Sequence, residues 1–421
     1  MARADRTRRS AAYDAGVSDD AGNDPFGSNN PFQGMPIFGD LAKMFQNQGA
    51  MSWDAARQFA LSIATGGEAE PNVDPLERIK IEQLARVAEL QIANATGLDP
   101  APGGQGVTIT PVNRTTWTQH TLEAYRPLFE ILATSLSENE QAQPADQLVD
   151  PADPMGFMAP LMKMIGPMML GLTAGSMVGH LAQRCFGQYD LPIPRPAGDQ
   201  ILLIVANLDE FGREWSLPPD DLRLWVCLHE VAHHAVIGIP HVRARLEQLL
   251  GQYLAGFEPD PGRLEQELSG FESMDLTGPD ALQNMMGNPE VILGAIQSPA
   301  QRALLPQLEA LVCAIVGYVD VVMDEVGGSM LTGYAQLTEA LRRRRVEAAS
   351  SDRFVEQLFG LELGQASYDR GSAFIEGIVS RAGKDGLARL WASEKDLPTP
   401  AEVDAPGLWL ARIDLPDDLS S

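Results

Sequence analysis

The five residues from His229 to His233, H-E-V-A-H, constrain the fold of this chain more than any other feature of its sequence. On a helix, histidines four residues apart lie on one face, with the intervening glutamate beside them. The flanking residues favour a helix, because Pro219 suits a first turn and Gly238 followed by Pro240 suits an end. The sequence therefore predicts a helix from about Pro219 to Ile237 that carries a polar cluster among apolar neighbours.

This pattern is typical of a zinc site that carries its own base. His229 and His233 can each present a neutral ring nitrogen to one Zn²⁺ at about 2.0–2.1 Å. Glu230 can take a proton from a metal-bound water, which zinc acidifies while it polarises a carbonyl group. The predicted chemistry is hydrolysis of a peptide or amide bond, with Glu230 as the catalytic base. The alternative is a pair of core histidines without metal, which is costly to bury.

A third protein ligand has to come from another segment. His241 lies two residues beyond the place that an extended H-E-x-x-H-x-x-G-x-x-H pattern requires. His234 faces another side of the helix and suits a core or supporting role. The remaining ligand must therefore come from another helix, as in thermolysin-like sites, where an E-x-x-x-D helix provides it.

The apolar run from Leu311 to Val326 contains two acids, Asp320 and Asp324, four residues apart. Asp320 lies among valines, which favours it as the third ligand, or as the acceptor from a ligating imidazole. Asp324 lies nearer the predicted helix end and suits a solvated or supporting role. The alternative for Asp320 is a buried acid paired with an arginine, and Val316 stands where a thermolysin-like E-x-x-x-D pattern would have glutamate.

Charge and cysteine content limit the other function classes. The chain has 421 residues, and its 31 basic and 57 acidic residues give a net charge of -26, which argues against nucleic acid or an anionic membrane surface as a partner. The basic run Arg342–Arg345 suits a solvated helix end or an ion-pair partner for local acids. Three separated cysteines and an N-terminus without a secretory apolar run predict a cytoplasmic location.

We expect four regions along the chain: a disordered tail at 1–30, an N-terminal helical region at 31–153, a catalytic region at 154–414 and a flexible end at 415–421. Longer helices are predicted over 74–96 and 117–136. The β-branched run Gln200–Asn207 predicts a buried strand leading directly into the histidine helix, and helices are expected again from Glu290 to Arg345.

The Met- and Gly-rich segment Pro154–Gln183 is almost uncharged, and its length is close to that of a membrane span. Its proline, glycines and polar side chains make it weakly hydrophobic, so we favour a buried core helix. Gly171, Gly175 and Gly179 would allow another helix to approach closely in either setting.

Several segments together resemble the actinobacterial zincin-like metallopeptidase family, whose sister group is associated with deazaflavin-cofactor biosynthesis. They are the H-E-V-A-H-H helix, Phe186–Pro194, Gly317–Asp324, Leu397–Glu402 and Trp409–Arg412. The resemblance runs from about residue 31 to 414. It implies a mainly α zincin-like fold with a small β-sheet, and the usual roles for His229, Glu230 and His233.

The leading hypothesis is thus a cytoplasmic zinc metallopeptidase or related hydrolase acting on a peptide or amide substrate, with no nucleic-acid partner. One alternative is a catalytically inactive zincin-like scaffold or interaction protein, suggested by Val316. Another, less favoured, is a membrane-associated protein anchored by the Met- and Gly-rich segment. The sequence specifies neither the substrate nor the oligomeric state.

Overall fold

The computed structural model describes residues 49–101, 104, 106–141, 154–259, 295–347 and 350–415. The tail predicted at 1–30 lies outside these residues, as does nearly all of the end predicted at 415–421. Nearly all of the described residues belong to one compact unit, within 48–149 and 165–421. The boundary expected at residue 153 stays a prediction.

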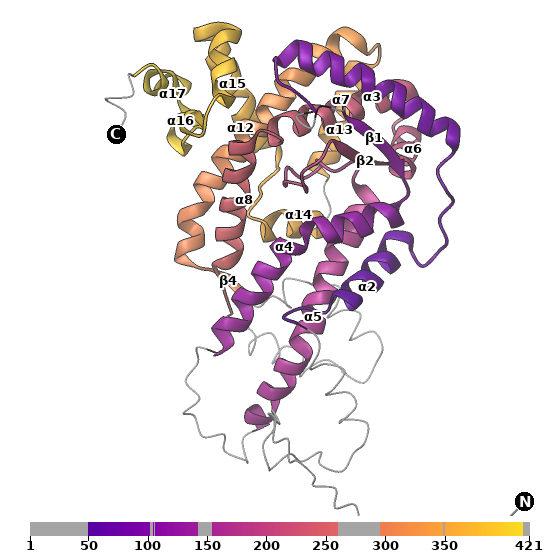
Figure 1. Cartoon of the computed structure of the whole chain (residues 1–421), viewed down its shortest axis with the longest axis vertical. Coiled ribbons are helices and arrows are strands. Elements are labelled where there is room, and N and C mark those ends of the chain that lie inside the picture. The colour runs from indigo at the N-terminus through magenta and orange to yellow at the C-terminus, as the bar shows by residue number, and fades with distance from the viewer. Residues whose placement is uncertain are drawn as a thin grey trace, which may run out of the picture. The chain divides into compact units, whose positions relative to one another are not determined.

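The described residues are mostly helical, as predicted, and include a small parallel sheet (Figure 1). In chain order the longer elements are α2 (Trp53–Thr65), α3 (Pro75–Thr96), β1 (Thr108–Val112), α4 (Arg114–Gln141), α5 (Pro154–Arg184), β2 (Gln200–Ile204), α6 (Val205–Glu214), α7 (Pro219–Ile237), α8 (Pro240–Ala255), α12 (Pro299–Met330), α13 (Tyr334–Val346), α14 (Ser350–Leu358) and α15 (Gln365–Ala388). The short elements are β3 (Phe257–Pro259), β4 (Ala295–Gln297), η2 (Arg389–Trp391), η3 (Glu394–Asp396), α16 (Pro400–Asp404) and α17 (Pro406–Ile413).

The sheet differs from the one expected before α7. β2 ends at Ile204, and the ten-residue helix α6 separates it from α7, so the strand does not lead directly into the histidine helix. Its partner is β1, which pairs with it in parallel, Thr108 opposite Gln200 and Val112 opposite Ile204. The prediction of one strand over Gln200–Asn207 was therefore wrong at its end. Asn207 already lies in the helix, where its amide donates to the carbonyl oxygens of Ala182 and Cys185.

Two other expectations about the C-terminal half also need correction. Residues 295–297 are not helical but form β4, which pairs antiparallel with β3. The helix predicted from the apolar run Leu311–Val326 does not end just after Val326 but continues to Met330 as part of α12. The ring of Tyr334 packs directly against Gly327, where a larger side chain would collide with it.

Glycines allow the helices to pack at backbone contact. A Cβ added to Gly371 of α15 would overlap the carbonyl oxygen of Cys313, and one added to Gly317 of α12 would overlap the backbone of Gly371. In the same way Gly171 of α5 meets the backbone of Ser52, the N-cap of α2, and Gly175 meets the backbone of Ala56 within α2, which agrees with the close helix packing expected there.

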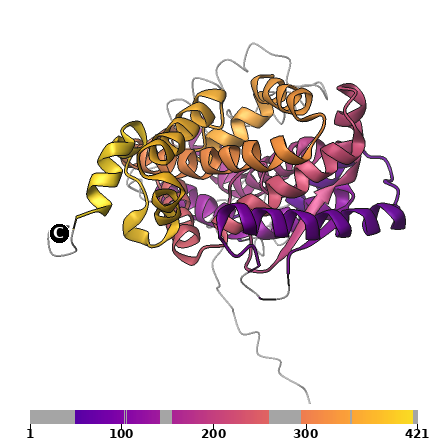
Figure 2. The ribbon, with the colours of Figure 1, turned by 90° about the horizontal axis from the view of Figure 1, so that it is seen from above.

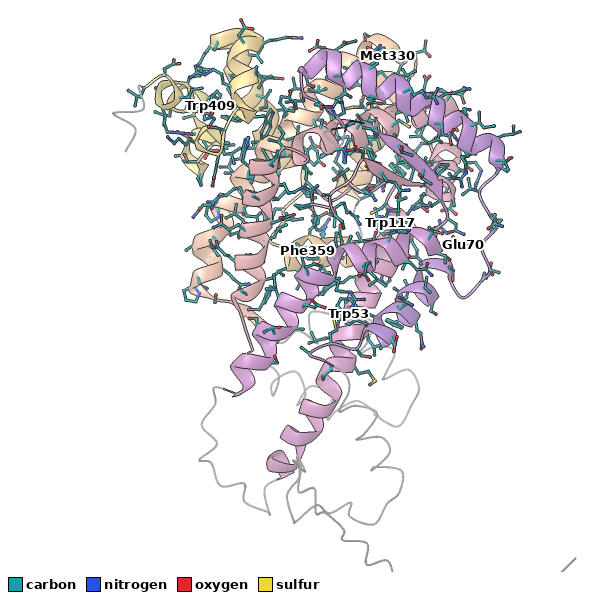
Figure 3. The ribbon with its side chains drawn as sticks, in the orientation of Figure 1. Trp53, Glu70, Trp117, Met330, Phe359 and Trp409 are labelled. Atoms are coloured by element: carbon teal, nitrogen blue, oxygen red, sulfur yellow. The ribbon has the colours of Figure 1, made fainter. Side chains whose placement is uncertain are left out.

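α12 is the helix, among the described residues, that is long and apolar enough to cross a membrane. Two thirds of its most apolar stretch, 67%, is buried in the protein, which is typical of a core helix. Along its length it packs on α7, α8 and α15 (Figures 1 and 2). Aromatic side chains fill the interior nearby, and Trp117 and Phe359 are both almost fully buried (Figure 3). The cysteines at 185, 227 and 313 are buried, as small apolar side chains would be, and form no disulfide among the described residues.

Candidate metal centre

α7 forms over the predicted range, Pro219–Ile237, and carries the H-E-x-x-H residues through the interior. It lies between α3 and α12 (Figure 1) and is buried along most of its length. Asp220 and Asp221 in its first turn complement the positive end of the helix dipole. The polar cluster of the motif is therefore enclosed by apolar packing, as the sequence indicated.

The two imidazoles lie against each other on one face of α7. The ring centroids of His229 and His233 are 4.3 Å apart, and Trp225 stacks on His229 with centroids 4.8 Å apart. His233 Nδ1 lies 3.1 Å from the carbonyl oxygen of His229, which leaves Nε2 as the nitrogen open to another group. This arrangement orients the rings before any ligand binds.

Burial keeps both imidazoles neutral. It lowers the pKa of His229 to about 4, and it lowers the pKa of His233 well below the ordinary value, with the neighbouring His229 adding to the effect. A neutral imidazole is the form that binds a metal. At neutral pH the pair is thus in the correct protonation state for two metal ligands.

Glu230 is held by the segment that joins α5 to β2. Its carboxylate accepts hydrogen bonds from the backbone N–H of Gln188 at 2.7 Å and of Tyr189 at 3.1 Å. A Cβ at Gly187 would overlap the carboxylate, so glycine is needed for this approach. Only 1% of Glu230 is exposed, and it lies beside His229, whose Nδ1 is 3.7 Å from its Oε1.

The pKa of Glu230 is raised to about 8. Burial is the largest cause and the charge of Asp190 adds to it, while the two backbone N–H donors oppose the rise. In the metal-free protein this carboxyl group therefore holds a proton at neutral pH. A positive charge placed between the imidazoles would favour its ionised form.

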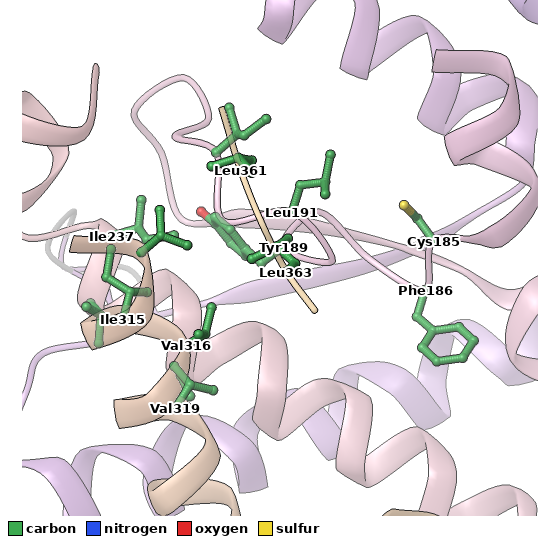
Figure 4. Packing of buried hydrophobic residues seen from close by; sticks show 14 of the residues in the cluster. Cys185, Phe186, Tyr189, Leu191, Ile237, Ile315, Val316, Val319, Leu361 and Leu363 are labelled. Atoms are coloured by element: carbon green, nitrogen blue, oxygen red, sulfur yellow. The ribbon is translucent and has the colours of Figure 1, made fainter. Parts of the chain in front are cut away.

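The loop Phe186–Leu191 makes further contacts that position the motif. The ring of Tyr189 stacks on His233, and its hydroxyl lies 2.9 Å from Nδ1 of His234. His234 is buried and outside the imidazole pair, in the supporting role that the sequence suggested. Figure 4 shows Tyr189 among apolar side chains, with Val316 and Val319 on the face of α12 turned toward it.

Asp320, the predicted third ligand, lies on the wall of the same cavity as His229 and His233. Its side chain is 38% exposed, and its Oδ1 is 3.7 Å from Nη2 of Arg345. Burial raises the pKa of the Asp320 carboxyl, and the charge of Arg345 opposes that rise. The structure thus places the acid in the cavity next to the arginine partner that was the alternative explanation for it.

The carboxylate of Asp324 makes its contact outside this cavity. Its Oδ1 accepts a hydrogen bond of 2.5 Å from the hydroxyl of Tyr334, in the exposed first turn of α13. This agrees with the supporting or solvated role expected for it. His241 contributes nothing to the walls of the cavity that holds the imidazole pair.

Asp190, for which the sequence gave no role, and Arg344 of the basic run also line this cavity. Asp190 Oδ2 accepts the backbone N–H groups of Phe186 and Gly187 at 2.7 and 3.0 Å, and its Oδ1 is 3.3 Å from Arg344. Arg344 also lies over the ring of Phe186, 3.8 Å from its centroid. The run Arg342–Arg345 therefore includes ion-pair partners for acids in the cavity, which was one of its two predicted roles.

The cavity has a volume of about 90 Å³ and is formed by α7, α12, α13, the start of α15 and the loop after α5. A larger cavity of about 770 Å³ lies between α8, α12 and residues 394–400, but none of the motif side chains lines it. In the part of the chain that is described, no three His, Cys, Asp or Glu side chains are close enough together to hold a metal ion. The neutral imidazole pair is chemically suited to a metal ion, but among the described residues no third donor lies close enough to complete a site with it.

The sequence also matches a known protein family. The family profile of the zincin-like metallopeptidases matches residues 51–410, most of the chain. The chain belongs to the zincin-like metallopeptidase family. Neither the actinobacterial origin nor the deazaflavin-related sister group expected from the sequence is tested by this match.

A solved structure is also similar. The crystal structure of a proposed hydrolase with a novel fold from Chloroflexus aurantiacus superposes with a TM-score of 0.61 at 26% sequence identity. The similarity covers 87% of this chain and 99% of that one. A search of curated proteins gives no match. Family and structural neighbour together support a hydrolase.

Proposed function

We propose that this protein is a zinc-dependent hydrolase of peptide or amide bonds. The observation that carries the proposal is the pair of neutral imidazoles, His229 and His233, set one turn apart beside the buried carboxyl group of Glu230. Membership of the zincin-like metallopeptidase family supports the same chemistry. A bound Zn²⁺ would supply Lewis acidity for a carbonyl group and would acidify a water molecule.

The residues of the chain then have separate tasks. His229 and His233 would hold the ion, and the contacts of Tyr189 and Trp225 keep their rings in place. Glu230 would accept the proton of the attacking water on a carboxylate oxygen and later give it to the leaving amine. The backbone N–H groups of Gln188 and Tyr189 hold that carboxylate in position and stabilise its charged form.

We propose Asp320 as the third ligand, since it shares the cavity and its present partner is a loosely placed arginine at 3.7 Å. A divalent ion would compete with Arg345 for the carboxylate, because direct coordination is stronger than a long, half-exposed ion pair. Asp324 serves as the matched control. It lies on the same helix but bonds to Tyr334 outside the cavity.

The test combines metal analysis with activity. Wild-type protein should bind one zinc per chain and cleave peptides from a mixed-sequence fluorogenic library. His229→Ala should lose the metal, and Glu230→Gln should keep the metal but lose turnover by about 100-fold or more, the usual range for removing a general base. His120→Ala, an exposed histidine on α4, should change neither. Zinc content unaffected by His229→Ala would contradict the proposal.

Asp320→Ala should weaken zinc binding by roughly 10-fold to 100-fold, while Asp324→Ala should leave it within about twofold. Equal effects of the two variants would exclude Asp320 as a ligand and leave the imidazole pair in need of another donor.

A second candidate, the catalytically inactive scaffold, is favoured by two observations. Arg345 already neutralises Asp320, and the cavity of about 90 Å³ is small beside ordinary ligand sites. For this candidate we expect stoichiometric zinc, or none, with no cleavage of the peptide library. Turnover that Glu230→Gln abolishes would eliminate it.

A further inference from the structure

The helix α3 has two apolar faces. Ile81, Ala85, Ala88 and Ile92 are buried against the rest of the protein. Seven large apolar side chains are strongly exposed among the described residues, and four of them also lie on α3. They are Leu76, 73% exposed, Ile79, 52%, Val87, 37%, and Leu90, 59%. A surface helix of a monomer needs only one apolar face.

These four side chains form one continuous stripe. At about 100° per residue they lie within about 80° of one another on the helix, on the side opposite the buried face. Gln83 lies at the middle of the stripe. Figures 1 and 2 both show α3 along the outside of the described unit.

The spacing of the stripe is symmetric about Gln83. Ile79 and Val87 each lie four residues from it, and Leu76 and Leu90 each lie seven residues from it. If a second copy of α3 packs antiparallel across a two-fold axis at Gln83, Ile79 meets Val87 of the partner subunit. In the same pairing Leu76 meets the partner subunit's Leu90. A surface that is complementary to itself in this way is what a two-fold interface requires.

The flanking charges fit the same symmetry. Glu82 and Arg86 are exposed on one flank of the stripe. In the antiparallel pairing each flank meets the same flank of the second copy, so Arg86 lies beside Glu82 of the partner subunit, and Glu82 lies beside Arg86 of the partner subunit. A parallel pairing would bring the opposite flank of the second copy beside these residues and would not form these two ion pairs.

From this stripe we infer that α3 is a homodimerisation surface and that the partner is a second copy of this chain, paired antiparallel about Gln83. The glutamine at the axis provides a polar contact that fixes the register, in the way that single polar residues do in paired helices. The 22-residue helix is about 33 Å long, so a contact limited to α3 buries less than a standard interface. We therefore expect a weak, transient dimer.

Cysteine cross-linking tests the register directly, because the three native cysteines are buried. Gln83→Cys in the full chain should form a disulfide-linked dimer under mild oxidation, since the two positions face each other at the axis. Leu76→Cys should not, because the two positions would be about 21 Å apart, far beyond disulfide reach. Leu76→Cys mixed with Leu90→Cys should cross-link. Self-linking of Leu76→Cys, or no linking of Gln83→Cys, would overturn the inference.

Sedimentation velocity over about 1 to 200 μM tests the association itself. Arg86→Glu should weaken the dimer at least fivefold, and Glu82→Arg combined with Arg86→Glu should restore it, since the charge pairs are re-formed with reversed signs. A wild-type chain that stays monomeric over the whole range would overturn the inference, whether lipid, another protein or another segment of the same chain covers the stripe.

Discussion

Replacing Glu230 by glutamine should stabilise the metal-free protein at alkaline pH. Burial raises the pKa of this carboxyl group from 4.5 to about 8, so its ionisation is far less favourable in the folded chain than in the unfolded chain. A tenfold change in an acid dissociation constant corresponds to about 1.4 kcal/mol, so this rise in pKa sets an upper limit of roughly 5 kcal/mol above pH 8. Glutamine has a similar shape and cannot ionise, so it avoids this penalty.

The sign depends on pH. Below about pH 4.5 the Glu230 carboxyl group is protonated in both the folded and the unfolded chain, so it does not lower the free energy of unfolding. As the pH rises, the unfolded chain loses the proton first, so the folded state loses stability until the pH passes the folded pKa of about 8. We expect Glu230→Gln to increase the free energy of unfolding by about 3 to 5 kcal/mol at pH 8.5. At pH 5.5 the change should be within about 1 kcal/mol, since the amide is a weaker acceptor for two N–H groups.

Urea unfolding with a chelator present, at both pH values, measures this difference. Glu339→Gln is the matched control, because Glu339 is exposed and paired with Arg343, an interaction worth less than about 1 kcal/mol. Two results would refute the reasoning: Glu230→Gln is stabilised by the same amount at pH 5.5 and 8.5, or it is destabilised at pH 8.5. Either result would mean that the loss of stability at alkaline pH does not come from ionisation of a buried Glu230 carboxyl group.

Three further predictions concern packing and acid stability. Gly187→Ala should displace Glu230 and lower hydrolytic activity at least tenfold, measured beside Gly166→Ala, whose added Cβ meets nothing. Gly317→Ala should separate α12 from α15 and lower the free energy of unfolding by roughly 2 kcal/mol or more, while Gly328→Ala should cost less than about 1 kcal/mol in the same urea titration. His229 should contribute a loss of stability to the metal-free protein as the pH falls from about 6.5 to 4, because the unfolded chain protonates His229 where the folded chain does not. The difference between the stability curves of wild type and His229→Ala separates this contribution from that of Glu230, which has the opposite sign. A histidine replacement that leaves the acid limb of the stability curve unchanged would contradict this last prediction.

The sequence predicted the elements whose signals are local. Pro219 and Gly238 marked the ends of α7 correctly, and the range 74–96 agrees with α3 and its cap at Asp74. These signals work because capping and first-turn preferences depend on neighbouring residues alone. The end of the strand before α6 was missed, since Val205 and Ala206 suit a buried strand and a buried helix equally well.

The features that depend on contacts between distant segments were harder to predict from the sequence. The helix over 74–96 was predicted without its orientation, and in the structure Ile81 faces the core while Ile79 and Leu90 face outward. Asp190 has no spacing signal relative to the motif, and only folding brings its loop against Glu230. Arg345 lies 25 residues after Asp320, and the turn between α12 and α13 brings the two together.

The most direct test of the proposed centre is an anomalous-scattering map, at the zinc absorption edge, from crystals of the full chain grown with zinc. We expect one peak at full occupancy within about 2.0–2.1 Å of a ring nitrogen from both His229 and His233, with a carboxylate oxygen of Asp320 completing the protein ligands. A map without a peak between the two rings, from crystals whose solution contains excess zinc, would contradict the metal centre and the hydrolase chemistry built on it.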